Sequence, residues 1–197
     1  MKTMKVKITF TEELLGSASA KQDIHSEFIA SKAPDAKSRE EEIAAVGVEE
    51  YIENAMTVFP RNENGEPIIW DYQIRGFFKA ACGFLRKVDD CKSKSLKAFK
   101  KEIDGLVHVR PRAIPIVFEG EIGNCQRPLR AETAQGARVA LANSESIPAG
   151  ATAEFEVIML NDKDEELVRE WLDFGQWNGL GQWRNSGKGC FTWEEIQ

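Results

Sequence analysis

Residues 179–189 read Gly-Leu-Gly-Gln-Trp-Arg-Asn-Ser-Gly-Lys-Gly, and this stretch decides the expected fold and site. It lies between a segment with helical spacing, 165–177, and a strand-like segment, 190–193. Glycine tolerates positive φ and lets a ligand approach the backbone amides closely. Together with the charges of Arg184 and Lys188, such a loop can bind a phosphate group. The alternative is a loop that only links a helix to a strand.

Hydrophobic periodicity on the N-terminal side of the loop predicts further regular elements. Residues 5–10 and 153–160 alternate polar and apolar side chains, which is the period of a half-buried strand. Residues 163–177 have the spacing of an amphipathic helix. Asp71 is a favourable N-cap for an earlier helix. The apolar positions of that earlier helix are Ile74, Phe77, Phe78, Ala81, Phe84 and Leu85.

Shorter extended segments complete the pattern. They cover 56–59, 68–70, 106–109, 114–118 and 139–141, and a polar stretch precedes the last of them. Pro111 and Pro115 predict an edge strand or an irregular strand, because proline cannot donate a ladder hydrogen bond. The order reduces to β-α-β-β-α-β. We therefore predict an α+β, ferredoxin-like fold with an antiparallel sheet and its helices on one face.

Two segments lie outside this β-α-β-β-α-β order. Residues 19–55 form a compositionally separate block that we interpret as two short helices. Residues 86–104 are rich in lysine and are interpreted as a basic helical insertion. We expect residues 1–197 to form a single domain that carries both insertions.

Charge is unevenly distributed along the chain. The formal net charge is −6, but residues 75–138 hold 14 Lys/Arg against 7 Asp/Glu, a balance of +7. The flanking segments, 1–74 and 139–197, have balances of −6 and −7. A basic middle between acidic ends favours a localised positive surface, which an anionic ligand requires.

Several classes of site are not indicated by the sequence. The four cysteines (82, 91, 125 and 190) show no Cys-x-x-Cys pair, and the histidines are only two, His25 and His108. No zinc-ligand spacing is recognisable, so we predict neither a metal nor a cofactor. No apolar run is long enough to span a bilayer, and the N-terminus lacks the apolar block of a signal peptide. The predicted location is the cytoplasm.

The glycine-rich stretch resembles a known family signature, G-hydrophobic-G-x5-G-x-G. That signature belongs to the RAMP superfamily, the repeat-associated RNA-binding proteins of CRISPR effector complexes, in which it joins the last helix to the last strand. Residues 10–17, 64–79 and 147–150 resemble further family segments. Trp70-Asp71-Tyr72 departs from the Pro and Ser/Thr usual before the first helix. The chain also resembles proteins encoded by prophages.

The resemblance implies a ferredoxin-like RNA-binding protein, with RNA or a phosphate-containing nucleotide as partner. A CRISPR or other nucleic-acid defence complex is a further implied partner, and an oligomer is compatible with the sequence. Trp183 either stacks on a base or fills a position in the core. The candidate binding residues are Gly179, Gly181, Trp183, Arg184, Asn185, Ser186, Gly187, Lys188, Gly189, Arg75, Lys79, Arg110, Arg112, Arg127 and Arg130.

Three alternatives to a non-catalytic RNA-binding protein stay open. One is a protein that sequesters a cyclic or linear nucleotide signal. Another is a protein–protein inhibitor or assembly subunit that uses residues 19–55. The third is a metal-independent endoribonuclease, as found in the superfamily, with His108 or His25 as general base. His108 lies between two valines in a predicted strand, a setting typical of a structural histidine. We therefore expect no catalytic residue.

Overall fold

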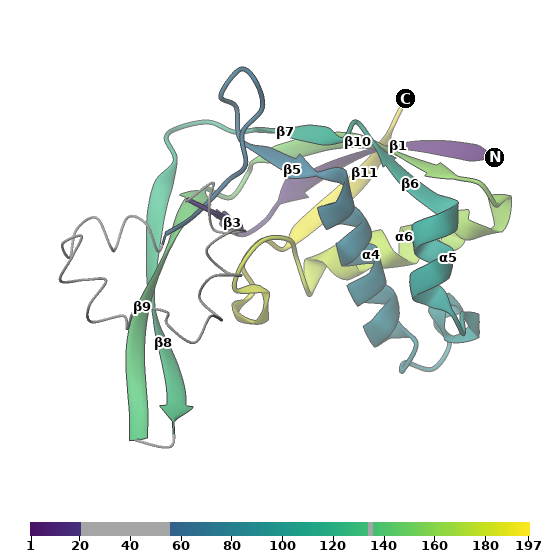
Figure 1. The fold of residues 1–197 in the computed structure, drawn as a ribbon. Coiled ribbons are helices and arrows are strands. Elements are labelled where there is room, and N and C mark those ends of the chain that lie inside the picture. Colours follow the sequence, from purple (N-terminus) through teal and green to yellow (C-terminus); the bar gives the residue numbers. More distant parts are fainter. Residues whose placement is uncertain (21–55, 134–135) are drawn as a thin grey trace, which may run out of the picture.

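The chain forms two β-sheets, with the described helices on one side of the larger sheet (Figure 1). The structure, a computed structural model, describes residues 1–20, 56–133 and 136–197, and the side chains of these residues except within 129–141. The predicted elaboration therefore lies outside the described residues, apart from its first two positions. Ser19, which begins it, belongs to a short strand, β3 (Ala18–Ser19).

The larger sheet has six strands in the order β11-β1-β10-β7-β5, with β6 also paired to β10. Their bounds are β1 Lys2–Phe10, β5 Ile68–Trp70, β6 Val107–Arg110, β7 Ala113–Val117, β10 Thr152–Met159 and β11 Phe191–Ile196. All of these pairs are antiparallel. With β6 and β7 taken as one interrupted strand, the order β11-β1-β10-β6/β7 is that of a ferredoxin-like sheet, to which β5 is added at the edge. This confirms the predicted α+β class.

The two principal helices pack on the same face of this sheet. They are α4 (Asp71–Leu85) and α6 (Glu165–Asp173), and a third helix, α5 (Phe99–Leu106), leads into β6. Alternate residues of β1, such as Val6 and Ile8, are fully buried and join the core with Phe78 and Trp171 from the helices. Period-2 burial in the strands and 3.6-residue burial in the helices thus converge on one hydrophobic layer.

Several predicted boundaries need correction. Residue 70, not Asp71, is the N-cap of α4, and Gln73 Oε1 accepts its backbone N–H at 2.8 Å. The basic insertion is not one helix but the 3₁₀ turn η1 (Lys92–Ser95) followed by α5. Residues 163–177 divide into η2 (Asp162–Asp164), α6 and η3 (Phe174–Gln176). Short 3₁₀ turns commonly flank α-helices, and periodicity alone does not separate them.

The largest difference from the sequence prediction is a long hairpin. The polar stretch and the short strand after it form β8 (Gly123–Thr133) and β9 (Gly136–Ile147), which pair along their whole length. The hairpin projects away from the main sheet (Figure 1). Its base joins a second sheet with β2 (Leu14–Leu15), β3 and β4 (Thr57–Val58).

Candidate nucleic-acid interface

The glycine loop folds back on itself and onto the segment after β1. Leu180 donates its N–H to the carbonyl of Gly189 at 3.0 Å, and Gly189 donates to the carbonyl of Glu13 at 2.8 Å. A Cβ added to Gly179 would lie 1.8 Å from the Gly189 carbonyl oxygen, and one added to Gly181 would lie 2.5 Å from the Leu15 carbonyl oxygen. These three glycines therefore permit backbone-to-backbone contact and fix the shape of the loop.

The tip of the loop is a single 3₁₀ turn, η4 (Arg184–Ser186), between two left-handed residues. Gly187 has φ +82° and donates its N–H to the Arg184 carbonyl. Trp183 has φ 55°, which is an outlier for a bulky side chain and marks local strain. The turn leaves the side chains of Arg184, Asn185 and Ser186 exposed.

Lys188 does not extend freely from this loop. Its Nζ forms a 2.7 Å ion pair with Glu13. Burial acts to raise the pKa of the Glu13 carboxyl, but hydrogen bonds from Lys188 and Ser146 outweigh burial and hold that pKa below its ordinary value. The ion pair therefore links the end of the loop to the chain segment that follows β1.

Arg127 connects the hairpin to the loop. It is only 5% exposed, and its Nη1 donates to Ser144 Oγ at 3.1 Å. Its Nη2 lies 3.5 Å from Gln182 Oε1, and its guanidinium lies over the Trp183 ring, 5.4 Å from the centroid. Its Nε has no hydrogen-bond partner among the described residues. Buried charges are usually paired, yet within the described residues Arg127 has no carboxylate partner.

A second group of arginines lies where α4 begins. Arg75, Arg110 and Arg112 line a cavity of about 520 Å³, together with Asp71 and Tyr72. Arg75 is bound to Asp71 at 3.1 Å. Arg110 and Arg112 are exposed and form no ion pair with any described residue.

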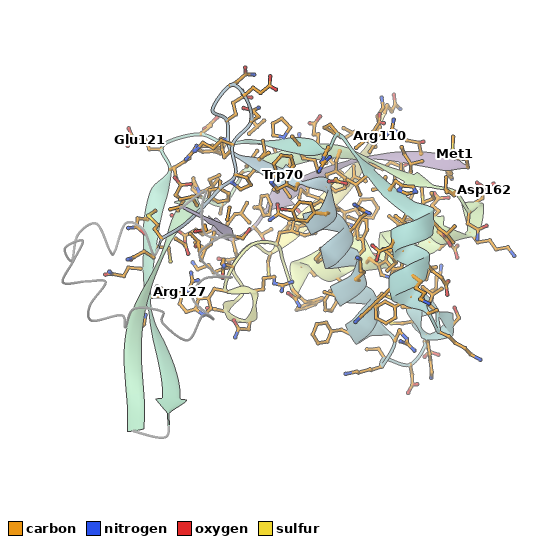
Figure 2. All side chains as sticks on the ribbon, in the orientation of Figure 1. Met1, Trp70, Arg110, Glu121, Arg127 and Asp162 are labelled. Carbon is orange, nitrogen blue, oxygen red and sulfur yellow. The ribbon has the colours of Figure 1, made fainter. Side chains whose placement is uncertain are left out.

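Most of the predicted cations thus form two separate groups instead of one, and Lys79 belongs to neither group. Figure 2 shows Arg110 near the end of the large sheet and Arg127 beside the base of the hairpin, well apart. Lys79 is paired with Asp104 at 2.5 Å. The side chain of Arg130 lies outside the described residues. Among the described members, the cations without a carboxylate partner are Arg110, Arg112, Arg127 and Arg184.

The open face of the large sheet is electrically balanced. Lys5 lies in register between Glu156 and Ile196. Lys7 lies between Glu154 and Glu194, with its Nζ 3.9 Å from the Glu194 carboxylate. The next position along β1 is a threonine, with threonines on both sides. This face therefore has alternating charges and, at these described positions, no aromatic side chain for base stacking, unlike the stacking sheets of RNA-recognition folds.

Groups for catalysis or metal binding are few among the described residues. His108 lies on β6 opposite Ile158, and its imidazole forms no hydrogen bond with a described residue. His25 lies outside the described residues. No cluster of three or more His, Cys, Asp or Glu in the described part of the chain could hold a metal ion. None of the described helices is long and apolar enough to cross a membrane.

Sequence reasoning missed several residues around the loop. Ser144 and Gln182 hold Arg127, and Asn178 and Phe84 line a cavity beside Trp183. Phe84 is one of the apolar positions predicted for α4, but its side chain is 53% exposed. A signal was available: Phe84 lies in the last turn of its helix, where an apolar stripe can extend beyond the sheet that it covers.

The fold places the chain among α+β proteins with a ferredoxin-like sheet and an added hairpin. It is similar to a chain in the cryo-EM structure of the Type III-B Cmr-beta complex bound to cognate target RNA, with a TM-score of 0.54 and 12% identity. That match covers all of this chain and 60% of the other. This likeness concerns the fold alone. No family model matches the sequence, and no curated protein matches it.

Proposed function

We propose that this protein binds single-stranded RNA at the junction of the glycine loop and the β8–β9 hairpin, without cleaving it. The observation that carries the proposal is the set formed by Arg127, Trp183 and Arg184. Arg127 is buried, has no carboxylate partner among the described residues, and contacts the indole of Trp183. Trp183 is followed directly in the chain by Arg184, which is exposed. Charge-assisted contacts to phosphate and stacking on bases are the two main sources of affinity for single strands.

The charge balance of the two candidate surfaces supports this location. On the open sheet face, Lys7 lies between two glutamates, and Lys5 and Arg110 both lie beside Glu156. Three cations therefore face three glutamates, and that face offers little net attraction to phosphates. Arg184, in contrast, has no ion-pair partner among the described residues. The similarity to a chain of an RNA-bound Cmr complex is a second, independent support, which concerns the fold alone.

The proposal includes no catalytic step. A general base for RNA cleavage must reach the 2′-hydroxyl of the substrate. His108 lies on the open sheet face, on β6, whereas the proposed RNA site is on the loop and hairpin. We further propose that the protein acts within or upon a CRISPR or other nucleic-acid defence complex. A phage origin for it rests on the sequence resemblance.

Fluorescence anisotropy with a labelled, unstructured RNA at low and at moderate salt tests the proposal. We expect binding that weakens steeply with salt and that falls on Arg184→Ala. The matched control is Lys97→Ala, which removes an exposed positive charge from the linker between η1 and α5. The absence of binding at low salt would refute the function. Equal losses in both variants would refute the site.

A further inference from the structure

A cavity of about 370 Å³ lies beside the glycine loop, between the C-terminal half of α4 and the tip of the loop. This volume falls within the range of about 300–1,000 Å³ typical of small-molecule sites. The described residues that line it are Ala80, Phe84, Asn178, Gly181, Gln182, Trp183, Arg184 and Asn185. Two aromatic rings, three carboxamides and one arginine therefore border the same space.

The aromatic lining is held in place from outside the cavity. Phe84 stacks on Phe174, with ring centroids 5.9 Å apart and planes inclined by 24°. Trp183 is held by the guanidinium of Arg127 against its ring. A ring that is already supported loses little conformational freedom when a second flat group stacks on it, and this favours binding. A solvent-exposed phenylalanine beside a positive charge suits a planar, electron-rich ligand.

The polar lining has hydrogen-bonding capacity to spare. Asn178 Oδ1 is buried and has no hydrogen-bond partner. Asn185 is exposed and forms no hydrogen bond with a described residue. A carboxamide presents a donor and an acceptor side by side, and adenine presents the matching pair at N6 and N7. Satisfying an orphaned carbonyl oxygen would remove a cost that the free protein carries.

From this lining we propose that the cavity is a base pocket, which receives one unpaired adenine of a bound RNA strand. In this arrangement Phe84 and Trp183 contact the base plane, Asn178 contacts the base edge, and Arg184 binds a neighbouring phosphate. The inference rests on the proposed function and deepens it, because a phosphate-binding loop alone does not distinguish one base from another.

The test compares three short oligouridylates that differ only at the central position: adenine, uracil or an abasic sugar. Arg184→Ala weakens all three, because each keeps the same phosphates. A stacked base contributes roughly a 5- to 150-fold gain in affinity, so the adenine strand binds tighter than the abasic strand by a factor in that range. Phe84→Leu removes this difference and Phe84→Tyr retains it. Asn178→Leu reduces the preference of adenine over uracil.

Phe84 is more than half exposed, so neither of its replacements empties a core position. Thermal unfolding of both variants, expected to be unchanged, is the control for this. A second readout is 2-aminopurine at the central position, whose fluorescence falls when it stacks on an aromatic ring. Equal affinity for the adenine and abasic strands, with binding still dependent on Arg184, would overturn the base pocket and leave the proposed function standing. Failure of every strand to bind would overturn both.

Discussion

The guanidinium of Arg127, on the hairpin, lies over the indole of Trp183, on the glycine loop, with its Cζ 5.4 Å from the ring centroid. This contact joins two residues that are 56 positions apart in the sequence. Since Trp183 has a strained positive φ, the contact also helps to hold a conformation that the backbone alone disfavours.

A double-mutant cycle measures this coupling. Arg127→Met removes the charge and keeps most of the volume, and Trp183→Leu removes the ring. We expect each change to destabilise the fold and the pair to show a coupling of about 0.5–2 kcal/mol in urea unfolding. Arg127→Met combined with Trp193→Leu is the control. Trp193 binds Asp173 and shares no partner with Arg127, so these effects should add to within about 0.5 kcal/mol.

Two glycine substitutions of opposite sign test the architecture of the loop. Gly179→Ala places a methyl group 1.8 Å from the Gly189 carbonyl oxygen, where backbone must move. We expect a loss of about 3 kcal/mol or more in the free energy of unfolding. Gly76→Ala, in α4, meets no atom within 4 Å and should raise that free energy by about 0.5–1 kcal/mol. Chemical denaturation of both variants gives the values. A tolerated Gly179→Ala would mean that the loop is open rather than folded on itself.

The sequence was sufficient to predict the large sheet and its helices, because burial there follows a simple period. The strand from Lys2 to Phe10 alternates exposed and buried residues, and α4 buries the apolar positions expected of an amphipathic helix up to its last turn. These patterns are local, and a single sequence contains them.

The hairpin could not be predicted in the same way. β8 projects from the sheet and pairs only with β9. Burial alternates along its described residues, but the most buried position holds Arg127, so the sequence shows no strand-like alternation of apolar side chains. Pro128 within it also argues against a strand except at an edge. The burial of Arg127 contradicts the usual exposure of arginine. Likewise Lys188 was predicted to bind phosphate, but the structure pairs it with Glu13, 175 positions earlier. Pairings between residues so far apart in the chain produce no periodic pattern in the sequence.

The Glu13–Lys188 pair predicts a dependence of stability on pH. The pKa of Glu13 is lowered in the folded protein, so its contribution is present above the ordinary carboxyl value of 4.5 and is lost as pH falls through the folded value. The hydrogen bond to Glu13 raises the pKa of Lys188, so the contribution of Lys188 is present below its ordinary value of 10.5 and is lost at higher pH.

Glu13→Gln tests that dependence. The variant should unfold more easily than the wild type by up to about 1 kcal/mol near neutral pH, because the pair is partly exposed. This difference should shrink as the medium is made more acidic than the ordinary carboxyl pKa. Urea denaturation of both proteins across the acid range measures it. A difference that stays constant into strong acid would show that the Glu13 charge has no role.

The two candidate RNA surfaces make opposite predictions about lysines. On the open face, Lys7 lies between two glutamates and Lys5 lies beside one, so removing either charge should change RNA affinity little. Arg184 has no such neighbour among the described residues, and its loss should weaken binding and reduce the slope of log affinity against log salt by about 0.7.

Lys5→Ala, Lys7→Ala and Arg184→Ala are therefore compared over a series of salt concentrations, with folding checked by circular dichroism. If both lysine variants lower the slope as Arg184→Ala does, the RNA lies across the open sheet and the loop–hairpin junction is not the binding surface. If only Arg184→Ala lowers it, the balanced charges of the sheet explain why this chain would bind RNA through its loop and hairpin instead.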